Sequence, residues 1–191
     1  MLDKKLFTKL KKDYESFDVG RRIVIKNSND ILKASKQAIF ALHRERIKDA
    51  EELLKEAEDQ IKYLNDKIKS EKGLVYQGAY LAAMEEFVEA QLFYQFIKNK
   101  KITEIKDFRI GTDSYLGGLS DLTGELVRRG VFLATKKRYE EVEECEKMIE
   151  AIVGELIQLN LMGPLRNKFD QSKNSLRKIE EIMYDLEIKR K

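Results

Sequence analysis

The chain contains 191 residues, of which 42% are hydrophobic and 37% charged, with one proline and ten glycines. This length is enough for one domain with a sizeable core and excludes two full-sized domains, so residues 1–191 are expected to form a single domain. The formal net charge of +3 is close to neutral, so the total charge indicates no class of partner and its distribution along the chain is more informative.

Little in the sequence would interrupt long helices. No stretch of five or more residues alternates between polar and apolar, and the Asn-Gly and Asp-Gly turns typical of β-hairpins are absent. Lys, Glu, Leu and Ile dominate the composition. The sequence therefore predicts an all-α, single-domain bundle of about six or seven helices.

Cysteine content and hydropathy indicate the compartment. The single cysteine, Cys145, has no partner for an internal disulfide, and the N-terminus lacks the apolar core of a signal peptide. The longest uncharged run, Gly73 to Met84, is shorter than the span of about 20 residues that a bilayer requires. We therefore expect a cytoplasmic protein.

The first half of the chain predicts three helices. Charged amphipathic patterns cover about 2–70, with a helix boundary near 46–49, where the acids of "DAEELLKEAED" suit the first turns of a new helix. Gly73 breaks this pattern. A third helix is expected over about 75–98, apolar on nearly every side and hence central to the bundle.

The second half predicts three more helices. Thr112 or Asp113 is expected to cap a helix that runs to about Ala134. A charged helix should follow over about 137–161. Gly163 would end it, and Pro164 would open the last helix, where its missing N–H is harmless.

The most apolar segment carries acids but no base. Between Gly73 and Ile97 the only charged residues are Glu85, Glu86 and Glu89. Because Glu86 and Glu89 are three residues apart, they lie side by side on a helix.

The next predicted helix repeats this arrangement. Asp121 and Glu125 are four residues apart, and no Lys or Arg occurs between Asp113 and Arg128. Two helices would therefore each direct an acid pair at the apolar interior.

Spacing alone does not identify a site, because other glutamate pairs have a simpler explanation. Glu141 with Glu144, and Glu143 with Glu146, are interleaved with Lys and Arg, as on any solvated helix face. In contrast, burying an ionised carboxylate without a partner destabilises the folded protein by several kcal/mol. The four acids of the apolar segments must be protonated, paired with a cation distant in sequence, or neutralised by a metal ion, and all three alternatives remain open.

The residue types that are missing narrow the choice of metal. Carboxylate-bridged iron bundles use Glu-x-x-His motifs and catalytic zinc uses His or Cys, whereas the one histidine, His43, lies outside both acidic segments. We expect His43 at the surface or on a phosphate. All-oxygen ligands favour Mg²⁺ or Mn²⁺, which can hydrolyse a phosphodiester without a protein nucleophile.

A basic face precedes the acids in sequence. From Gly20 to Arg44 there are six basic residues and one acid, Asp30. On a helix, most of them fall with Asn29 in a band about 80° wide, which is either a solvated face or a surface for a phosphate backbone. The candidate nucleic-acid contacts are Arg21, Arg22, Lys26, Lys33, Lys36 and Arg44.

Three glycines inside the predicted fourth helix need compensation, because each costs about 1 kcal/mol relative to alanine. They are Gly117, Gly118 and Gly124. Close helix packing is the expected reason; room for a bound strand beside Asp121 is the alternative.

Two segments, "GGLSDLTGELVRRGV" and "MEEFVEAQLFYQFI", resemble the translin and translin-associated factor X (TRAX) family, as does the C-terminal "LRNKFDQSKNSLRKIEEIMYDLEI". The TRAX branch is the closer match, because its members carry Glu-aromatic-Val-Glu-Ala and Asp-Leu-Thr-Gly-Glu-Leu segments. The resemblance implies that metal-dependent ribonuclease residues correspond to Glu86, Glu89, Asp121 and Glu125.

The resemblance also implies a hollow oligomeric shell, commonly of eight subunits, that holds RNA as a single strand or short duplex, and single-stranded DNA as a further ligand. Since the chain has both the acids and a basic helix, we expect an archaeal-type homo-oligomer that is active without a second kind of subunit.

Two functions remain in competition. The first is an Mg²⁺- or Mn²⁺-dependent endoribonuclease, with Glu125 as a further ligand or as the base that orients water. The second is a non-catalytic nucleic-acid-binding oligomer. The catalytic hypothesis fails if the acids are scattered, or if each is held by its own guanidinium or ammonium.

Overall fold

The computed structural model describes residues 3–68, 73–74, 77–106 and 108–190, and every regular element in them is helical. This confirms the all-α prediction, with six α-helices among the described residues. The single-domain organisation stays a prediction.

The first two helices form an antiparallel pair joined by a tight turn. Helix α1 spans Lys4–His43 and α2 spans Ile47–Ile68, so the predicted boundary is confirmed. The Asp3 carboxylate caps α1 by accepting the backbone N–H groups of Lys5 and Leu6. In the turn, Glu45 adopts a positive φ of 59°, and its carboxylate is held by two arginines of later elements, Arg129 and Arg138.

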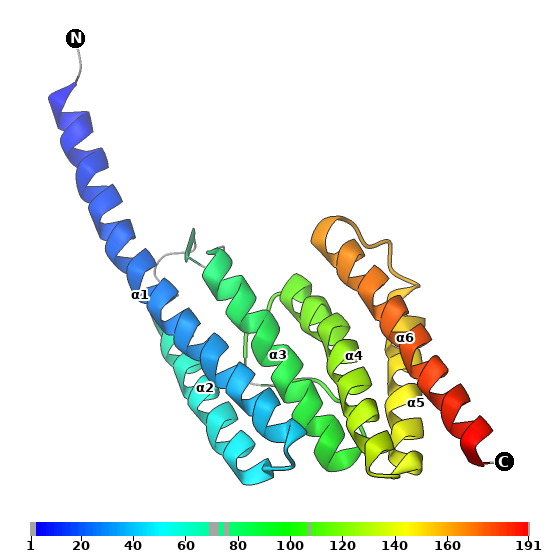
Figure 1. The fold of residues 1–191 in the computed structure, drawn as a ribbon. Coiled ribbons are helices and arrows are strands. Elements are labelled where there is room, and N and C mark those ends of the chain that lie inside the picture. The colour runs from blue at the N-terminus through cyan, green and yellow to red at the C-terminus, as the bar shows by residue number, and fades with distance from the viewer. Residues whose placement is uncertain (1–2, 69–72, 75–76, 107, 191) are drawn as a thin grey trace.

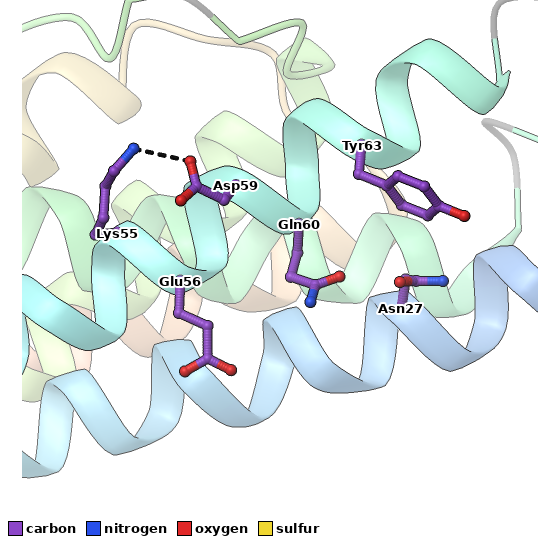
Figure 2. A pocket seen from close by; sticks show the side chains of 6 residues that line it. All are labelled: Asn27, Lys55, Glu56, Asp59, Gln60 and Tyr63. Atoms are coloured by element: carbon purple, nitrogen blue, oxygen red, sulfur yellow. Dashed lines mark hydrogen bonds and ion pairs between the residues drawn. The ribbon is translucent and has the colours of Figure 1, made fainter.

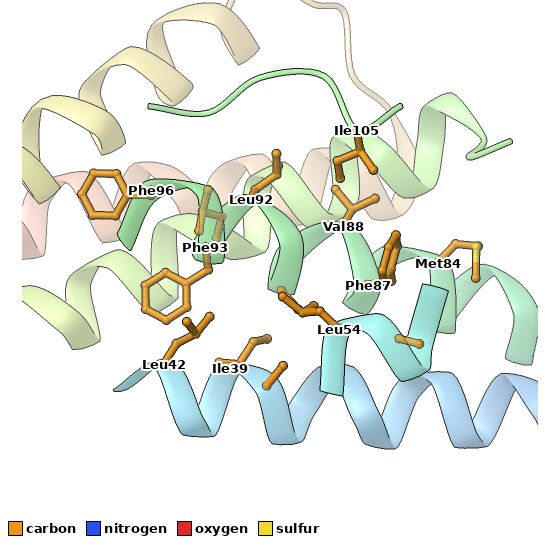
Figure 3. Close-up of a cluster of buried hydrophobic side chains, with 14 of the residues drawn as sticks. Ile39, Leu42, Leu54, Met84, Phe87, Val88, Leu92, Phe93, Phe96 and Ile105 are labelled. Carbon is orange, nitrogen blue, oxygen red and sulfur yellow. The ribbon is translucent and has the colours of Figure 1, made fainter. Parts of the chain in front are cut away.

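The central helix, α3, spans Gly78–Asn99. The predicted start near Val75 lies outside the described residues, whereas its end is confirmed within one residue. Its side chains Phe87, Phe93 and Phe96 are almost completely buried. Figure 3 shows them among Leu42 of α1 and Leu54 of α2, so the most apolar segment of the chain forms the middle of the core.

Helix α4 spans Thr112–Thr135. The predicted cap is wrong: Gly111 occupies the cap position without a side-chain hydrogen bond. Because the helix begins at Thr112, Thr112 and Asp113 both lie inside its first turn, where the Asp113 charge still complements the helix dipole.

The fifth helix is shorter than expected. Helix α5 spans Tyr139–Leu156, and the predicted end at Leu161 is wrong because Leu156 is the last buried apolar side chain of that face. Helix α6 spans Gly163–Arg190. Contrary to the prediction, Gly163 does not end α5 but begins α6 with a φ of +57°, and Pro164 lies in the first turn of α6 as predicted.

The helices lie in two layers. Figure 1 shows α1, α3, α4 and α6 side by side in that order, with α2 behind α1 and α5 behind α6, and the neighbouring helices are in contact. The acidic segments α3 and α4 therefore lie at the centre of the four-helix layer, with α1 and α6 on either side.

Candidate functional site

The four predicted acids project from the adjacent helices α3 and α4. Gly118 allows these helices to approach closely: a Cβ atom there would lie only 2.5 Å from the carbonyl oxygen of Glu85. Close packing is therefore the role of Gly118, as expected, whereas Gly117 faces the Glu85 side chain and Gly124 faces open space.

The pKa shifts of Glu86 and Glu89 indicate that the four acids lie near one another. Burial raises the pKa of Glu89 to about 9, and the charges of Glu86, Asp121 and Glu125 add to this effect. Burial likewise raises the pKa of Glu86, opposed by Lys36 and reinforced by Asp121 and Glu125. The carboxylates of the two helices thus lie within electrostatic reach of one another, as predicted.

The site also contains cations that the apolar segments lack, and they come from the two outer helices. From α1, the Nζ atom of Lys36 lies 3.8 Å from Oε2 of Glu86. From α6, the Nζ atom of Lys168 donates to Oδ2 of Asp121 at 2.5 Å and lies 3.1 Å from Oε1 of Glu85. Burial lowers the pKa of Lys168, but the hydrogen bonds to Asp121 and Glu85 outweigh burial and raise it, so the ammonium stays charged.

Glu125 has two basic neighbours. Its Oε2 atom forms a hydrogen bond with Nε2 of His43 and lies 3.4 Å from Nη1 of Arg128. Burial raises the pKa of Glu125, but His43 and Arg128 outweigh burial and bring it below its ordinary value. The expectation that His43 lies at the surface is therefore wrong: its ring is buried and packs 4.9 Å from that of Phe93.

The four acids are neutralised in different ways. Glu86, Asp121 and Glu125 each have a cationic partner. Glu89 is only 8% exposed and forms no hydrogen bond or ion pair with any described residue, so its carboxyl is protonated near neutral pH. Glu89 has no guanidinium or ammonium of its own, so the acids are not all held by separate cations, and their catalytic role stays a prediction.

The donor chemistry fits a hard divalent cation, because the acids offer only carboxylate oxygens and the buried Glu89 lacks a counter-charge. As the side chains lie, no three His, Cys, Asp or Glu residues in the described part of the chain form a ready metal-binding group. Oxygens of Glu86, Asp121 and Glu125 contact Lys36, Lys168 and His43 instead.

The basic band on α1 divides into paired and free residues. Arg21 and Arg22 both pair with Asp18, an acid that lies just before the basic segment from Gly20 to Arg44. Arg44 stacks on the Phe40 ring. Lys26 and Lys33 are exposed and form no ion pair with a described residue, so both are accessible to a ligand.

Sequence reasoning missed three functional candidates: Glu85, Lys168 and the His43 contact. Lys168 is 47 residues from Asp121 and His43 is 82 residues from Glu125, and no periodicity links residues on different helices. The position of Lys168 near the start of a helix with one buried face gives no signal of its own.

A groove of about 630 Å³ runs between α1 and α2, and none of the four acids borders it. Figure 2 shows its polar lining, in which the Lys55 ammonium is 2.8 Å from the Asp59 carboxylate. The lining residues are Asn27, Lys55, Glu56, Asp59, Gln60 and Tyr63. The acidic region is therefore separate from this groove.

Comparisons with known proteins agree on a family. Residues 20–190 match the Translin family. Translin of Bos taurus and Translin of Homo sapiens are each 29% identical over 119 residues, which is 58% of this chain and 51% of theirs. The chain thus spans about half the length of the curated relatives it matches.

Solved structures share the fold over nearly the whole chain. AfC3PO has a TM-score of 0.88 at 21% identity, covering 96% of this chain and 98% of its own. Apo-NeC3PO has a TM-score of 0.85 at 24% identity, and the complex of AfC3PO with duplex RNA has 0.84 at 22%, each covering 96% of this chain and 97% of theirs. Within the described residues, no helix is long and apolar enough to cross a bilayer.

Proposed function

The chain belongs to the translin family, and from this premise we propose that it is a metal-dependent endoribonuclease that cleaves single-stranded or short RNA inside a homo-oligomer. The observation that carries the proposal is the electrostatic coupling of four acids from α3 and α4 around the unpaired, buried Glu89. Glu89 stays protonated near neutral pH because it has no cation to offset its charge, and a divalent metal ion would replace that proton.

The acids would hold the metal, and their roles follow from their surroundings. Glu86, Glu89 and Asp121 are the proposed ligands for Mg²⁺ or Mn²⁺. Such an ion supplies an activated water and charge stabilisation at the phosphorus. Glu125, whose pKa lies below its ordinary value, is ionised near neutral pH and can accept a proton from water or serve as a further ligand.

The basic band gives the RNA a path to the acids. Lys36 belongs to this band and also lies 3.8 Å from Glu86, so the band ends at the acidic site. A phosphate backbone lying along Lys26 and Lys33 would reach the site at Lys36. The complex of AfC3PO with duplex RNA supports RNA as the ligand, and single-stranded DNA shares the same backbone chemistry.

We also assign the chain to the TRAX branch, in an archaeal-type homo-oligomer of eight copies in the cytoplasm. The complete acidic set Glu86, Glu89, Asp121 and Glu125 supports the branch. A stable monomer under active conditions, measured by light scattering, would contradict the oligomer.

Asp121→Asn and Glu86→Gln test the catalytic role. Each variant removes one proposed ligand charge and keeps the side-chain volume, so we expect cleavage to fall by about a hundredfold or more while RNA binding and helicity persist. The measurement is cleavage of a short single-stranded RNA with Mn²⁺ titrated in and then chelated, beside binding to the same RNA. Glu52→Gln, at an exposed position of α2, is the matched control.

The second candidate is a non-catalytic nucleic-acid-binding oligomer. It is favoured by the ion pairs of Glu86, Asp121 and Glu125, which give these acids a structural explanation. No cleavage by the wild type at any Mn²⁺ concentration, with RNA binding retained, would select this candidate. Full cleavage by Asp121→Asn would instead contradict the catalytic role of the acids.

A further inference from the structure

Lys168 is the cation that α6 contributes to the acidic site. Its Nζ atom lies between the two acidic helices, 2.5 Å from Oδ2 of Asp121 on α4 and 3.1 Å from Oε1 of Glu85 on α3. Its charge also acts on Glu89, whose pKa it lowers against the larger effects of burial and of the other acids. One ammonium therefore interacts with three of the acids.

The position of Lys168 is fixed from both sides. On α3, the Glu85 carboxylate lies over Gly117, where a Cβ atom would come 2.0 Å from Oε2, so the absence of a side chain at Gly117 leaves room for the carboxylate where it lies. On α6, the Ser172 hydroxyl lies 3.2 Å from the carbonyl oxygen of Ser120 and 3.1 Å from that of Lys168. These contacts hold the base of the Lys168 side chain against α4, next to Asp121.

The contact with Asp121 uses only one carboxylate oxygen. Oδ2 accepts from Lys168, whereas Oδ1 accepts no hydrogen bond from any described residue. A carboxylate held by one oxygen presents the other in a fixed direction, which is how neighbouring hydrogen bonds orient metal ligands.

We propose that Lys168 is a positioning residue of the site, which holds Asp121 by Oδ2 and leaves Oδ1 free to bind a divalent metal ion, and that Glu85 anchors Lys168 rather than binding metal. This inference rests on the proposed function. It separates Glu85 from its neighbours Glu86 and Glu89, and it gives α6 a part in a site whose acids all come from α3 and α4.

Removing the ammonium distinguishes positioning from simple charge repulsion. If Lys168 only repelled the metal ion, Lys168→Met would bind Mn²⁺ more tightly. If Lys168 positions Asp121, the same variant should bind Mn²⁺ more weakly by about tenfold or more. Isothermal titration of the full chain with Mn²⁺, without RNA, measures this directly.

The catalytic readout should agree. We expect Lys168→Met to lower kcat by about tenfold or more with little change in KM for RNA, and Lys168→Arg to restore most of the Mn²⁺ affinity because it keeps the charged donor. Lys173→Met is the matched control, since Lys173 lies on the same helix and pairs with Asp170 at the surface. Lys168→Gln, which keeps a donor without the charge, is measured as well, so that misfolding of the methionine variant does not end the test.

The outcomes separate the two proposals. Unchanged or tighter Mn²⁺ binding by folded Lys168→Met or Lys168→Gln, with a wild type that binds Mn²⁺ and cleaves RNA, overturns only the role of Lys168. A wild type that neither binds Mn²⁺ nor cleaves RNA overturns the proposed function, and the role of Lys168 with it.

Discussion

Glu89 is a buried carboxyl for which the structure provides no partner among the described residues. Burial and the neighbouring acids raise its pKa to about 9, far above the value of about 4.3 for a free glutamate. Between these two values the folded state holds a proton that the unfolded state has released. The free energy of unfolding must therefore fall as pH rises through this window.

Replacing Glu89 by glutamine removes this pH dependence. With metal chelated, Glu89→Gln should melt above the wild type, by a margin that grows from pH 5 to pH 9 and reaches on the order of a few kcal/mol. For a chain of this length, 1 kcal/mol corresponds to about 3 °C in Tm. Thermal denaturation across this pH range measures the margin, with Glu52→Gln as the control for amide substitution at an exposed site.

Added Mn²⁺ should reverse the order. If the proposed metal ion binds only the folded state, it should stabilise the wild type by mass action and the glutamine variant less. A margin that does not vary with pH, or that Mn²⁺ leaves unchanged, would contradict the role of Glu89 as a proton-bearing ligand.

Single residues mark the limit of what the sequence predicts. The acids could be found because Glu86 with Glu89 and Asp121 with Glu125 are neighbours on their own helices. Their partners could not, because Lys168 and His43 reach the site from helices whose relative placement no local pattern specifies. For the same reason, burial of His43 could not be predicted from its polar sequence context.

Gly118 and Gly124 of α4 differ in how closely other atoms pack against them. A Cβ atom at Gly118 would meet the backbone oxygen of Glu85 at 2.5 Å and Cβ of Val88 at 2.8 Å. Backbone cannot move aside as a side chain does, so α3 and α4 would have to separate. At Gly124 a Cβ atom meets nothing within 4 Å.

Alanine should therefore have opposite effects at the two positions. Gly118→Ala is expected to destabilise the protein by about 1–3 kcal/mol, and Gly124→Ala to stabilise it by up to about 1 kcal/mol, because alanine is the better helix former. Denaturant unfolding of the two variants beside the wild type tests this. Equal shifts in the same direction would contradict the packing account.

Helix existence was easier to predict than helix ends. The three-and-four spacing of apolar residues identifies α6, and the low content of Pro and Gly predicts long helices throughout. The end of α5 could not be predicted from the apolar pattern, because Ile157 and Leu159 continue that pattern but are exposed.

The arrangement of the six helices leaves the N-terminal part of α1 projecting beyond the other helices (Figure 1). An apolar stripe runs along it at three- and four-residue spacing, and its side chains are exposed. They are Leu6, Phe7, Leu10, Tyr14 and Phe17. A stripe of this size is an expected contact between copies in the proposed oligomer.

A charge in the stripe should weaken that contact. Leu10 is 53% exposed, so Leu10→Glu should change the stability of the isolated chain little. Burial of the new carboxylate between copies should weaken their association by several kcal/mol. We expect the variant to retain its helicity and to show a lower mass by light scattering at matched concentration. Lys12→Glu, on the opposite side of the same helix, should leave the mass unchanged, and equal masses for Leu10→Glu and the wild type would exclude the stripe as an oligomer contact.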